Sequence, residues 1–471
     1  MIIIGFYFYN KTGDVNDYYL GGRSLNKWVV SISAQASDMS GWLLMGLPGL
    51  AYLSGLNALW MAIGLIIGTY LNWTLIAKRL RLYTEIAGNS ITIPDFFENR
   101  FNDTTHLLRV ISALFILVFF TIYTASGFVA GAKLFEEILP VSYKIALMVG
   151  AFIIISYTFL GGFFAVAWTD LIQGLLMFFA IIAMPVFVIY KSGYNITNLN
   201  DAGLLNIITA KDGSNLSLIV VFSMLGWGLG YMGQPHILTR FMSIKSARKI
   251  KDSKIIAMVW VIVCLLLVVF MGLIGNTAIT GKLEDSEKVL ITLSQMYYPP
   301  VVTGIFLSAV LAAIMSTADS QLLVASSAFT KDLYNLFNKK ITEKRLVNIS
   351  RLAVIIIAVA AFLIALDPEN SVLRLVEFAW AGFGSTFGPV VVFALYWKRM
   401  TRLGAFAGII AGGATVIIWN CFEGGIFELY EMIPGVFISS IFLIIISVLD
   451  KSPYQKITGS FDYIRQKLKQ L

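Results

Sequence analysis

Apolar residues are grouped along this chain into about a dozen long stretches, and short polar segments separate them. Most stretches are about 20 residues long, the length that an α-helix needs to cross about 30 Å of hydrocarbon. The pattern therefore predicts an all-α membrane protein with about thirteen transmembrane helices, the first of them incomplete. The expected spans are 1–9, 29–53, 56–78, 109–136, 143–161, 164–190, 216–237, 254–280, 300–329, 350–367, 371–397, 403–421 and 430–449.

The composition agrees with a membrane protein. Of the 471 residues, 58% are hydrophobic and 13% are charged, whereas soluble domains carry about 25% charged residues. The two cysteines, Cys264 and Cys421, lie far apart in the sequence, so they suggest neither a disulfide framework nor a metal motif. The first apolar segment, 1–9, is too short to cross a bilayer, so the chain is expected to begin inside a helix.

Basic residues indicate how the helices are oriented. The net charge is +8 and the pI is about 9.2, but the lysines and arginines are spread over many loops, which argues against a nucleic-acid partner. With the first residue outside, most of the 35 lysines and arginines fall on one side of the membrane. The positive-inside rule places that side, with clusters at 78–81, 245–254 and 339–345 and the tail from Lys451, in the cytoplasm.

An enzymatic function is not expected. The chain contains two histidines, His106 and His236, and neither is followed by an acidic residue at a spacing typical of catalysis. The segment after Asp450 is about twenty residues of basic, amphipathic sequence, which is too short for a signalling domain. A transporter is therefore favoured over a membrane enzyme or a sensor.

Two apolar spans are interrupted by polar or flexible residues. The segment 33–42 (SAQASDMSGW) lies inside one helix, and 226–235 (GWGLGYMGQP) contains four glycines and a proline inside another helix, five helices later. Transporters with inverted repeats bind ions and solutes at pairs of broken helices, where backbone groups are freed near the middle of the membrane. The two segments are thus candidate halves of one site. The alternative is that the glycines only permit close packing of helices.

Three aspartates lie well within the expected spans, namely Asp38, Asp170 and Asp319. A charged group costs a few kcal/mol in hydrocarbon, so such residues are functional candidates. None has an obvious basic partner at helical spacing, as expected where the counter-charge is a mobile cation. Asp170 follows the glycine pair at 161–162, so a capping or water-facing role is equally open for it.

A third polar cluster lies in the span 300–329. Adjacent hydroxyls of Ser316 and Thr317 can face one point, and Ala313 can offer a carbonyl if the helix unwinds locally. Small hard cations prefer oxygen ligands of this kind. The pattern predicts half of a sodium site, and hydrogen bonding between helices is the alternative.

Five segments together closely resemble the sodium/solute symporter family, and within it the sodium/proline symporters. The resemblance runs nearly end to end. It implies two inverted five-helix repeats, as in leucine-transporter-like proteins, at 29–192 and 193–399. An incomplete helix and cytoplasmic loop (1–28) would precede the repeats, and two further helices (400–450) and a cytoplasmic tail (451–471) would follow. The five segments are 20–24 (LGGRS), 36–48 (ASDMSGWLLMGLP), 226–231 (GWGLGY), 233–237 (GQPHI) and 311–317 (LAAIMST).

The resemblance also implies roles for single residues. Asp38 resembles the essential carboxylate beside the ion site of the family, and Arg23 resembles a residue that affects sodium coupling from the cytoplasmic side. The implied sodium ligands are the carbonyls of Ala36, Met39 and Ala313 with the hydroxyls of Ser316 and Thr317. The implied proline site comprises Trp227, Tyr231 and Pro235, with Tyr123, Ser40, Gly41, Trp42 and Gly46 nearby. A possible second cation site comprises Asp170, Ser316, Asp319 and Ser320.

The expected function is electrogenic, sodium-coupled uptake of L-proline across a bacterial-type inner membrane. The expected partners are Na⁺, L-proline and the lipid bilayer, with no nucleic acid and no obligate protein partner. Three alternatives stay open. The same fold could carry another amino acid, pantothenate, a sugar or sialic acid; it could sense proline without moving it; or it could couple to protons through Asp38.

Overall fold

The computed structural model describes residues 15–192, 197, 199, 203–209, 213–338, 341–451 and 455–470. Over these residues the chain is helical, and its β-type pairing is limited to the isolated bridges Leu25–Ile244 and Thr209–Asn215. The prediction of an all-α protein is therefore confirmed. The expected span at 1–9 lies outside the described residues.

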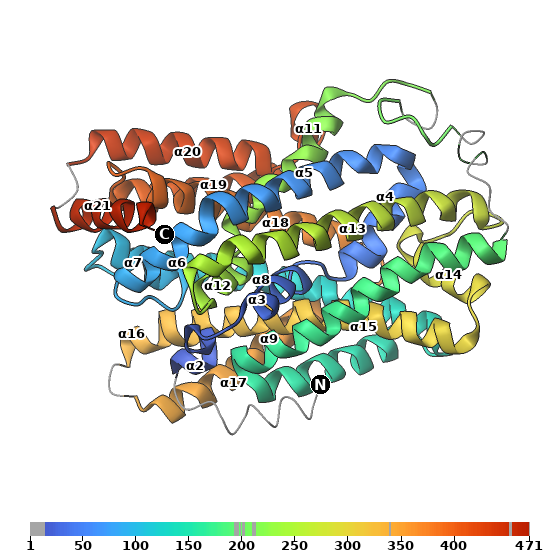
Figure 1. Cartoon of the computed structure of the whole chain (residues 1–471), viewed down its shortest axis with the longest axis horizontal. Helices are drawn as coiled ribbons and strands as arrows, with labels where there is room; N and C mark the ends of the chain where they lie inside the picture. The colour runs from blue at the N-terminus through green and yellow to red at the C-terminus, as the bar shows by residue number, and fades with distance from the viewer. Residues whose placement is uncertain are drawn as a thin grey trace.

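The long helices run side by side along the horizontal axis of Figure 1. The short helices α7, α16 and α21 lie at one end of the molecule and α14 at the other. The bounds are α2 (Val15–Leu20), α3 (Lys27–Ala36), α4 (Leu47–Ser54), α5 (Leu59–Leu71), α6 (Ala77–Ile86), α7 (Ile93–Phe101), α8 (Leu107–Ile138), α9 (Tyr143–Ser192), α11 (Leu218–Gly226), α12 (Pro235–Ser243), α13 (Ile250–Ala278), α14 (Val289–Tyr297), α15 (Pro300–Ser327), α16 (Asn335–Phe337), α17 (Glu343–Ile364), α18 (Val372–Tyr396), α19 (Arg402–Trp419), α20 (Met432–Leu449) and α21 (Gln455–Lys469).

Nine helical segments of the described chain are long and apolar enough to cross a membrane, and two shorter apolar helices accompany them at Tyr143–Ser156 and Leu218–Gly233. These segments differ in burial. The most apolar part of α18 is 83% buried, whereas that of α20 is 28% buried. Since an apolar helix that is exposed in a membrane protein faces lipid, α18 belongs to the interior and α20 to the periphery.

Both predicted interruptions are present. The span expected at 29–53 consists of α3 and α4, separated by a non-helical stretch after Ala36 and by a wide turn at Trp42–Gly46. The span expected at 216–237 consists of α11, a tight 3₁₀ segment at Trp227–Gly233, and the start of α12. The three C-terminal spans correspond to α18, α19 and α20, with bounds that differ by a few residues.

The expected spans 143–161 and 164–190 are joined without a loop. Both belong to α9, and the chain bends at Gly162, which has φ 58° and ψ −174°. A residue with a β-carbon is strained at this positive φ. A β-carbon here would also approach Cδ2 of Tyr18 to 2.8 Å. Glycine is thus required for this bend and for the contact with α2.

We expect Gly162→Ala to destabilise the protein by at least about 1–2 kcal/mol, because alanine is strained at positive φ and its methyl group collides with Tyr18. Thermal unfolding in detergent measures the effect. Gly150→Ala is the control in the same helix, since its β-carbon would make ordinary 3.6 Å contact with Phe135. A melting temperature that is equal for the two variants would contradict this account of the bend.

Candidate ion and solute site

The first break exposes a backbone carbonyl. In a continuous helix the Ala36 carbonyl would accept from the amide of Ser40, but that amide donates to the Asp38 carbonyl at 3.1 Å instead. Ala36 O accepts from the hydroxyl of Ser316 at 2.8 Å and from that of Thr317 at 3.2 Å. The break in α3 is therefore tied directly to α15.

The oxygens of four predicted sodium ligands meet at this contact. Ser316 Oγ also lies 3.1 Å from the Ala313 carbonyl, so two hydroxyls and two carbonyls from α3 and α15 are close enough to surround one small ion. The residues are buried. An uncharged oxygen shell suits a monovalent cation that must bind and leave. The Met39 side chain accepts from Trp260 Nε1 at 3.2 Å, and the role of the Met39 carbonyl as a fifth ligand stays a prediction.

Asp38 connects the two broken helices. The hydroxyl of Tyr231, on the second break, donates to Asp38 Oδ2 at 2.8 Å. The Asp38 carbonyl accepts from Trp42 Nε1 at 2.8 Å and from the hydroxyl of Tyr123 at 3.4 Å. Within the described chain, Asp38 Oδ1 has no hydrogen-bond partner and the carboxylate has no ion pair. A fully buried carboxylate without a basic partner favours a nearby cation.

Aromatic rings form a wall on the second break. The Trp227 ring stacks on Tyr430 at 5.4 Å between centroids and lies 6.3 Å from Trp42. Trp380 lies edge-on to Tyr231 at 5.1 Å and donates from Nε1 to the Trp227 carbonyl at 2.8 Å. The wall is buried and apolar, as expected of a site for a small organic solute.

Close approach of neighbouring helices depends on glycines of this segment. A β-carbon on Gly228 would lie 2.1 Å from the Gly64 carbonyl on α5, and one on Gly230 would lie 2.1 Å from Trp380 Nε1. The glycines of the second break therefore have a packing role, which was the alternative interpretation of the sequence. This role accompanies the interruption of the helix and does not replace it.

Other predicted solute contacts lie outside the aromatic wall. Gly41 faces the Ala130 side chain on α8, and Gly46 faces Leu373 on α18. The Ser40 hydroxyl accepts from the Trp42 amide at 3.3 Å. Pro235 lines a separate small cavity with Asp332. Of the eight implied contacts, Ser40, Trp42, Tyr123 and Tyr231 hydrogen-bond to Asp38, and Trp227 lies against Trp42.

The expectation that Asp170 has a mobile counter-charge is wrong. Its Oδ2 forms a 3.0 Å ion pair with Arg240 on α12 and accepts from the hydroxyl of Ser33 at 2.6 Å. Arg240 also donates to Ser33 and to Ser320, whose hydroxyl in turn donates to the Ser316 carbonyl at 2.8 Å. Because all these groups are buried, a fixed guanidinium balances the charge next to the sodium ligands.

Asp319 is buried beside this pair, and its Oδ1 accepts from Ser320 at 3.3 Å. The structure therefore groups Asp170, Ser316, Asp319 and Ser320, as the sequence suggested, but with Arg240 among them. The second cation site stays a prediction, and any ion there would have to share these oxygens with Arg240.

Arg23 lies apart from this site. It donates to the carbonyls of Ser90 and Met242 at 2.7 and 2.8 Å, which ties the segment before α3 to the segment after α6 and to the end of α12. Burial, followed in effect by the charge of Arg81, lowers the pKa of Arg23 to about 10. The guanidinium is therefore charged at neutral pH, and it also donates to the side chains of Asn89 and Thr84 at 3.0 and 3.2 Å.

At the opposite end of the bundle, a buried carboxylate caps α18. Glu287 accepts from the amides of Val372 and Leu373 at 3.1 and 3.0 Å and pairs with Lys133 at 2.7 Å. A carboxylate at a helix N-terminus is favoured by the free amides and the helix dipole. The cap links the segment before α14 to α8 and α18.

Comparisons with known proteins agree with this architecture. Residues 18–412 match the model of the sodium:solute symporter family. The chain belongs to this family. The "Sodium/proline symporter" of Escherichia coli K12 is 49% identical over 467 residues, which are 96% of this chain and 91% of that protein. The protein of the same description from Haemophilus influenzae Rd is 48% identical and covers 98% and 95%.

Solved structures show the same fold at low identity. A Na⁺-coupled sialic acid symporter in a substrate-bound, outward-open state superposes with a TM-score of 0.79 at 18% identity, over 96% of each chain. A nucleobase-cation-symport-1 family transporter superposes with a TM-score of 0.58 at 10% identity, over 95% of this chain and 98% of that one. This family member therefore shares its fold with cation-coupled symporters.

Three residues of the site have no visible signal in the sequence. Arg240, Trp380 and Tyr430 each contact a predicted site residue from a helix or loop distant in sequence. Arg240 stands in an ordinary amphipathic stretch, and the two aromatic residues stand among many others. Only the packing of α12, α18 and the segment before α20 brings them to the two breaks.

For the ion site, we expect Thr317→Ala to weaken sodium binding by roughly 10- to 100-fold, because losing a contact to a charged group costs about 1.5–3 kcal/mol. Thr317→Ser keeps the hydroxyl and is the matched control. Binding of ²²Na⁺ to purified protein measures both. Equal binding by the alanine and serine variants would exclude the Thr317 hydroxyl as a ligand.

For the buried pair, we expect Asp170→Asn or Arg240→Met alone to cost about 3–5 kcal/mol of stability, because each leaves a buried charge unpaired. The double variant should recover much of the loss, and thermal unfolding of all four proteins gives the coupling. If Asp170 instead binds sodium, Asp170→Asn would mainly reduce ²²Na⁺ binding, and the double variant would not recover stability.

Proposed function

We propose that this protein couples the entry of Na⁺ to the uptake of L-proline by alternating access. The observation that carries the proposal is the hydrogen bond from Tyr231 to Asp38. It joins the aromatic wall of the solute site to the residue beside the ion site. Relatives that are 46–49% identical over nearly the full chain bear the name "Sodium/proline symporter", which supports this solute and this ion.

The proposed arrangement has about thirteen transmembrane helices. Two inverted repeats of five helices, as in leucine-transporter-like proteins, would occupy 29–192 and 193–399, between the first helix and loop (1–28) and the segments 400–450 and 451–471. We place the first residue outside and the tail in the cytoplasm of a bacterial-type inner membrane, on the distribution of lysine and arginine. Two breaks that lie five helices apart support the repeat.

Binding of Na⁺ at Ala36, Met39, Ala313, Ser316 and Thr317 would stabilise the contact between the first break and α15. Asp38 would then be held in one position by the ion on one side and by Tyr231 on the other, which fixes the aromatic wall. The apolar ring of proline suits Trp227 and Tyr231, while its charged groups suit helix ends and hydroxyls. The ion and the solute would therefore increase each other's affinity.

The driving force is sufficient for accumulation. One Na⁺ moving through about 100 mV contributes roughly 2.3 kcal/mol, and a tenfold concentration gradient adds about 1.4 kcal/mol. Together these support accumulation of roughly several hundredfold at one ion per solute. Because zwitterionic proline has no net charge, uptake should move positive charge inward.

The decisive experiment is uptake of labelled L-proline into proteoliposomes that contain the purified protein. We expect uptake with an inward sodium gradient, faster uptake when the inside is negative, and none when choline replaces sodium at fixed pH. Asp38→Asn should abolish uptake, and Ser326→Ala, a buried hydroxyl away from the site, should retain it.

Other outcomes identify the alternatives. Uptake that persists in choline and follows a pH gradient would indicate proton coupling through Asp38. Binding of proline without uptake would indicate a sensor. If proline is neither bound nor moved, the same gradient applied to sialic acid, pantothenate, sugars and other amino acids would find the solute, and the proline assignment would be lost.

A further inference from the structure

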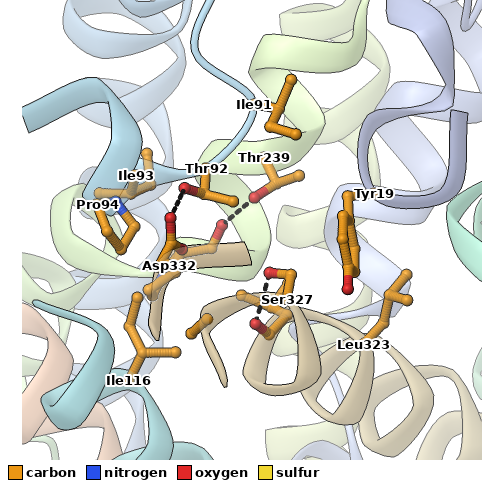
Figure 2. A pocket seen from close by; sticks show the side chains of 13 residues that line it. Tyr19, Ile91, Thr92, Ile93, Pro94, Ile116, Thr239, Leu323, Ser327 and Asp332 are labelled. Carbon is orange, nitrogen blue, oxygen red and sulfur yellow. Dashed lines mark hydrogen bonds between the residues drawn. The ribbon is translucent and has the colours of Figure 1, made fainter. Parts of the chain in front are cut away.

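A small cavity lies away from the proposed ion and solute site, between α2, the start of α7, α12 and the end of α15. Figure 2 shows polar side chains around it. The lining includes the hydroxyl residues Tyr19, Thr92, Thr239 and Ser327 and the carboxylate of Asp332. The free space is about 10 Å³, close to the roughly 10–15 Å³ that one water molecule needs. The cavity thus has room for a single small occupant.

One oxygen of Asp332 has no partner within the described chain. Oδ1 accepts from the hydroxyl of Thr92 at 2.9 Å and lies 3.3 Å from Arg109 Nε. Oδ2 is buried and finds no hydrogen bond among the described residues. Thr92 and Arg109 therefore fix the carboxylate through one oxygen and leave the other open. A buried polar atom without a partner in the protein needs an explanation, and a bound water or ion is one.

Two hydroxyls at the cavity have lone pairs to offer. Thr239 donates its hydrogen to the Pro235 carbonyl at 2.7 Å, and Ser327 donates to the Val324 carbonyl at 2.7 Å. Because both hydrogens are used within their own helices, the oxygens can accept but need not donate. Together with the Asp332 carboxylate they line the cavity with oxygens of the type that hard cations prefer.

Several charged side chains surround Asp332. Arg109 pairs with Asp95 and Glu98 as well as with Asp332, so three carboxylates surround one guanidinium. Lys331, the neighbour of Asp332, adds one positive charge at a partly exposed position. His106 contacts Glu98 at 2.9 Å on the far side of the cluster. One guanidinium is thus shared among three carboxylates, so Asp332 has less than a full fixed counter-charge from Arg109, which suits a bound cation.

The position of the cavity connects it to transport. Thr239 lies one turn after Pro235 on α12, and Ser327 lies ten residues after Thr317 on α15, a distance of about 15 Å along a helix. The helix α12 follows the second break almost directly, and α15 carries Thr317, so both helices that line the cavity lead to the proposed solute and ion sites. The cavity lies at the end of the bundle with α7 and α16 (Figure 1), which the basic loops predict to be cytoplasmic.

We propose that this cavity is a separate, weaker site for a monovalent cation, distinct from the group at Asp170 and bound by Asp332 with the hydroxyls of Thr239 and Ser327. Under the proposed function, on which this role rests, the cation is Na⁺ on its way from the ion site to the cytoplasm. An ion at this site keeps a negatively charged partner after it leaves the uncharged oxygens of the first site. The binding itself does not depend on which solute is carried.

Equilibrium binding of ²²Na⁺ to the purified full-length protein tests the site, without solute and over a wide range of sodium concentration. We expect two classes of site in the unchanged protein. Asp332→Asn should remove the weaker class and retain the tighter one, because the amide keeps the contact with Thr92 but offers no charge. Thr317→Ala should have the opposite effect.

A matched pair of serine variants tests the site independently, in case Asp332→Asn does not fold. Ser326 and Ser327 are both buried, and both donate to the carbonyl three residues earlier, at 2.9 and 2.7 Å, but only Ser327 lines the cavity. Ser327→Ala should weaken the second class several-fold, whereas Ser326→Ala should leave both classes unchanged. The tighter class reports in each variant that the protein is folded.

Uptake supplies an independent readout. In proteoliposomes, Asp332→Asn should lower the maximal rate several-fold and leave the external sodium concentration for half-maximal uptake unchanged. A single class of sodium sites in the unchanged protein would mean a water-filled cavity only, and two classes that survive Asp332→Asn would also overturn the proposal. Absence of proline uptake with both binding classes intact would instead refute the proposed solute and leave this site standing.

Discussion

The architecture of the site depends on the need to satisfy every backbone polar group inside a membrane. In hydrocarbon no water is available, so a carbonyl released by a broken helix must find another partner. The Ala36 carbonyl finds it in Ser316 and Thr317 on α15. The contact that satisfies this carbonyl thus brings together four oxygens. These oxygens can replace the hydration shell of an ion. The same atoms therefore stabilise the broken helix and can bind an ion.

The buried carboxylates Asp170 and Asp38 are stabilised in two different ways. Asp170 is balanced by Arg240, a cation that belongs to the protein. Within the described residues, the Asp38 carboxylate accepts from the hydroxyl of Tyr231 and has no basic partner, so its charge is available to a mobile ion. Because Ser320 touches both Arg240 and the Ser316 carbonyl, the fixed pair also supports the ion ligands. The difference between the two carboxylates lies in their partners and not in their burial.

Features that depend on local sequence were predictable. Glycine, proline and polar residues stand out within apolar spans, so the breaks after Ala36 and at Trp227 could be located from the sequence alone. The adjacent hydroxyls at 316–317 could likewise be identified as half of a site. Partners that depend on packing could not be found in this way. Arg240 lies 70 residues from Asp170, and Trp380 lies 153 residues from Trp227. Pro235 was assigned to the solute site because it follows the second break in sequence. The sequence did not reveal that it lines the cavity of Asp332 instead.

The bend at Gly162 has a consequence for how the protein is made. The two halves of α9 follow each other without a polar loop, and no lysine or arginine occurs from 145 to 190. Two apolar helices joined in this way carry no basic signal of their own to decide which end enters the bilayer first. Their orientation during insertion must therefore be set by the basic segments that flank them, and the pair should enter the membrane as one unit.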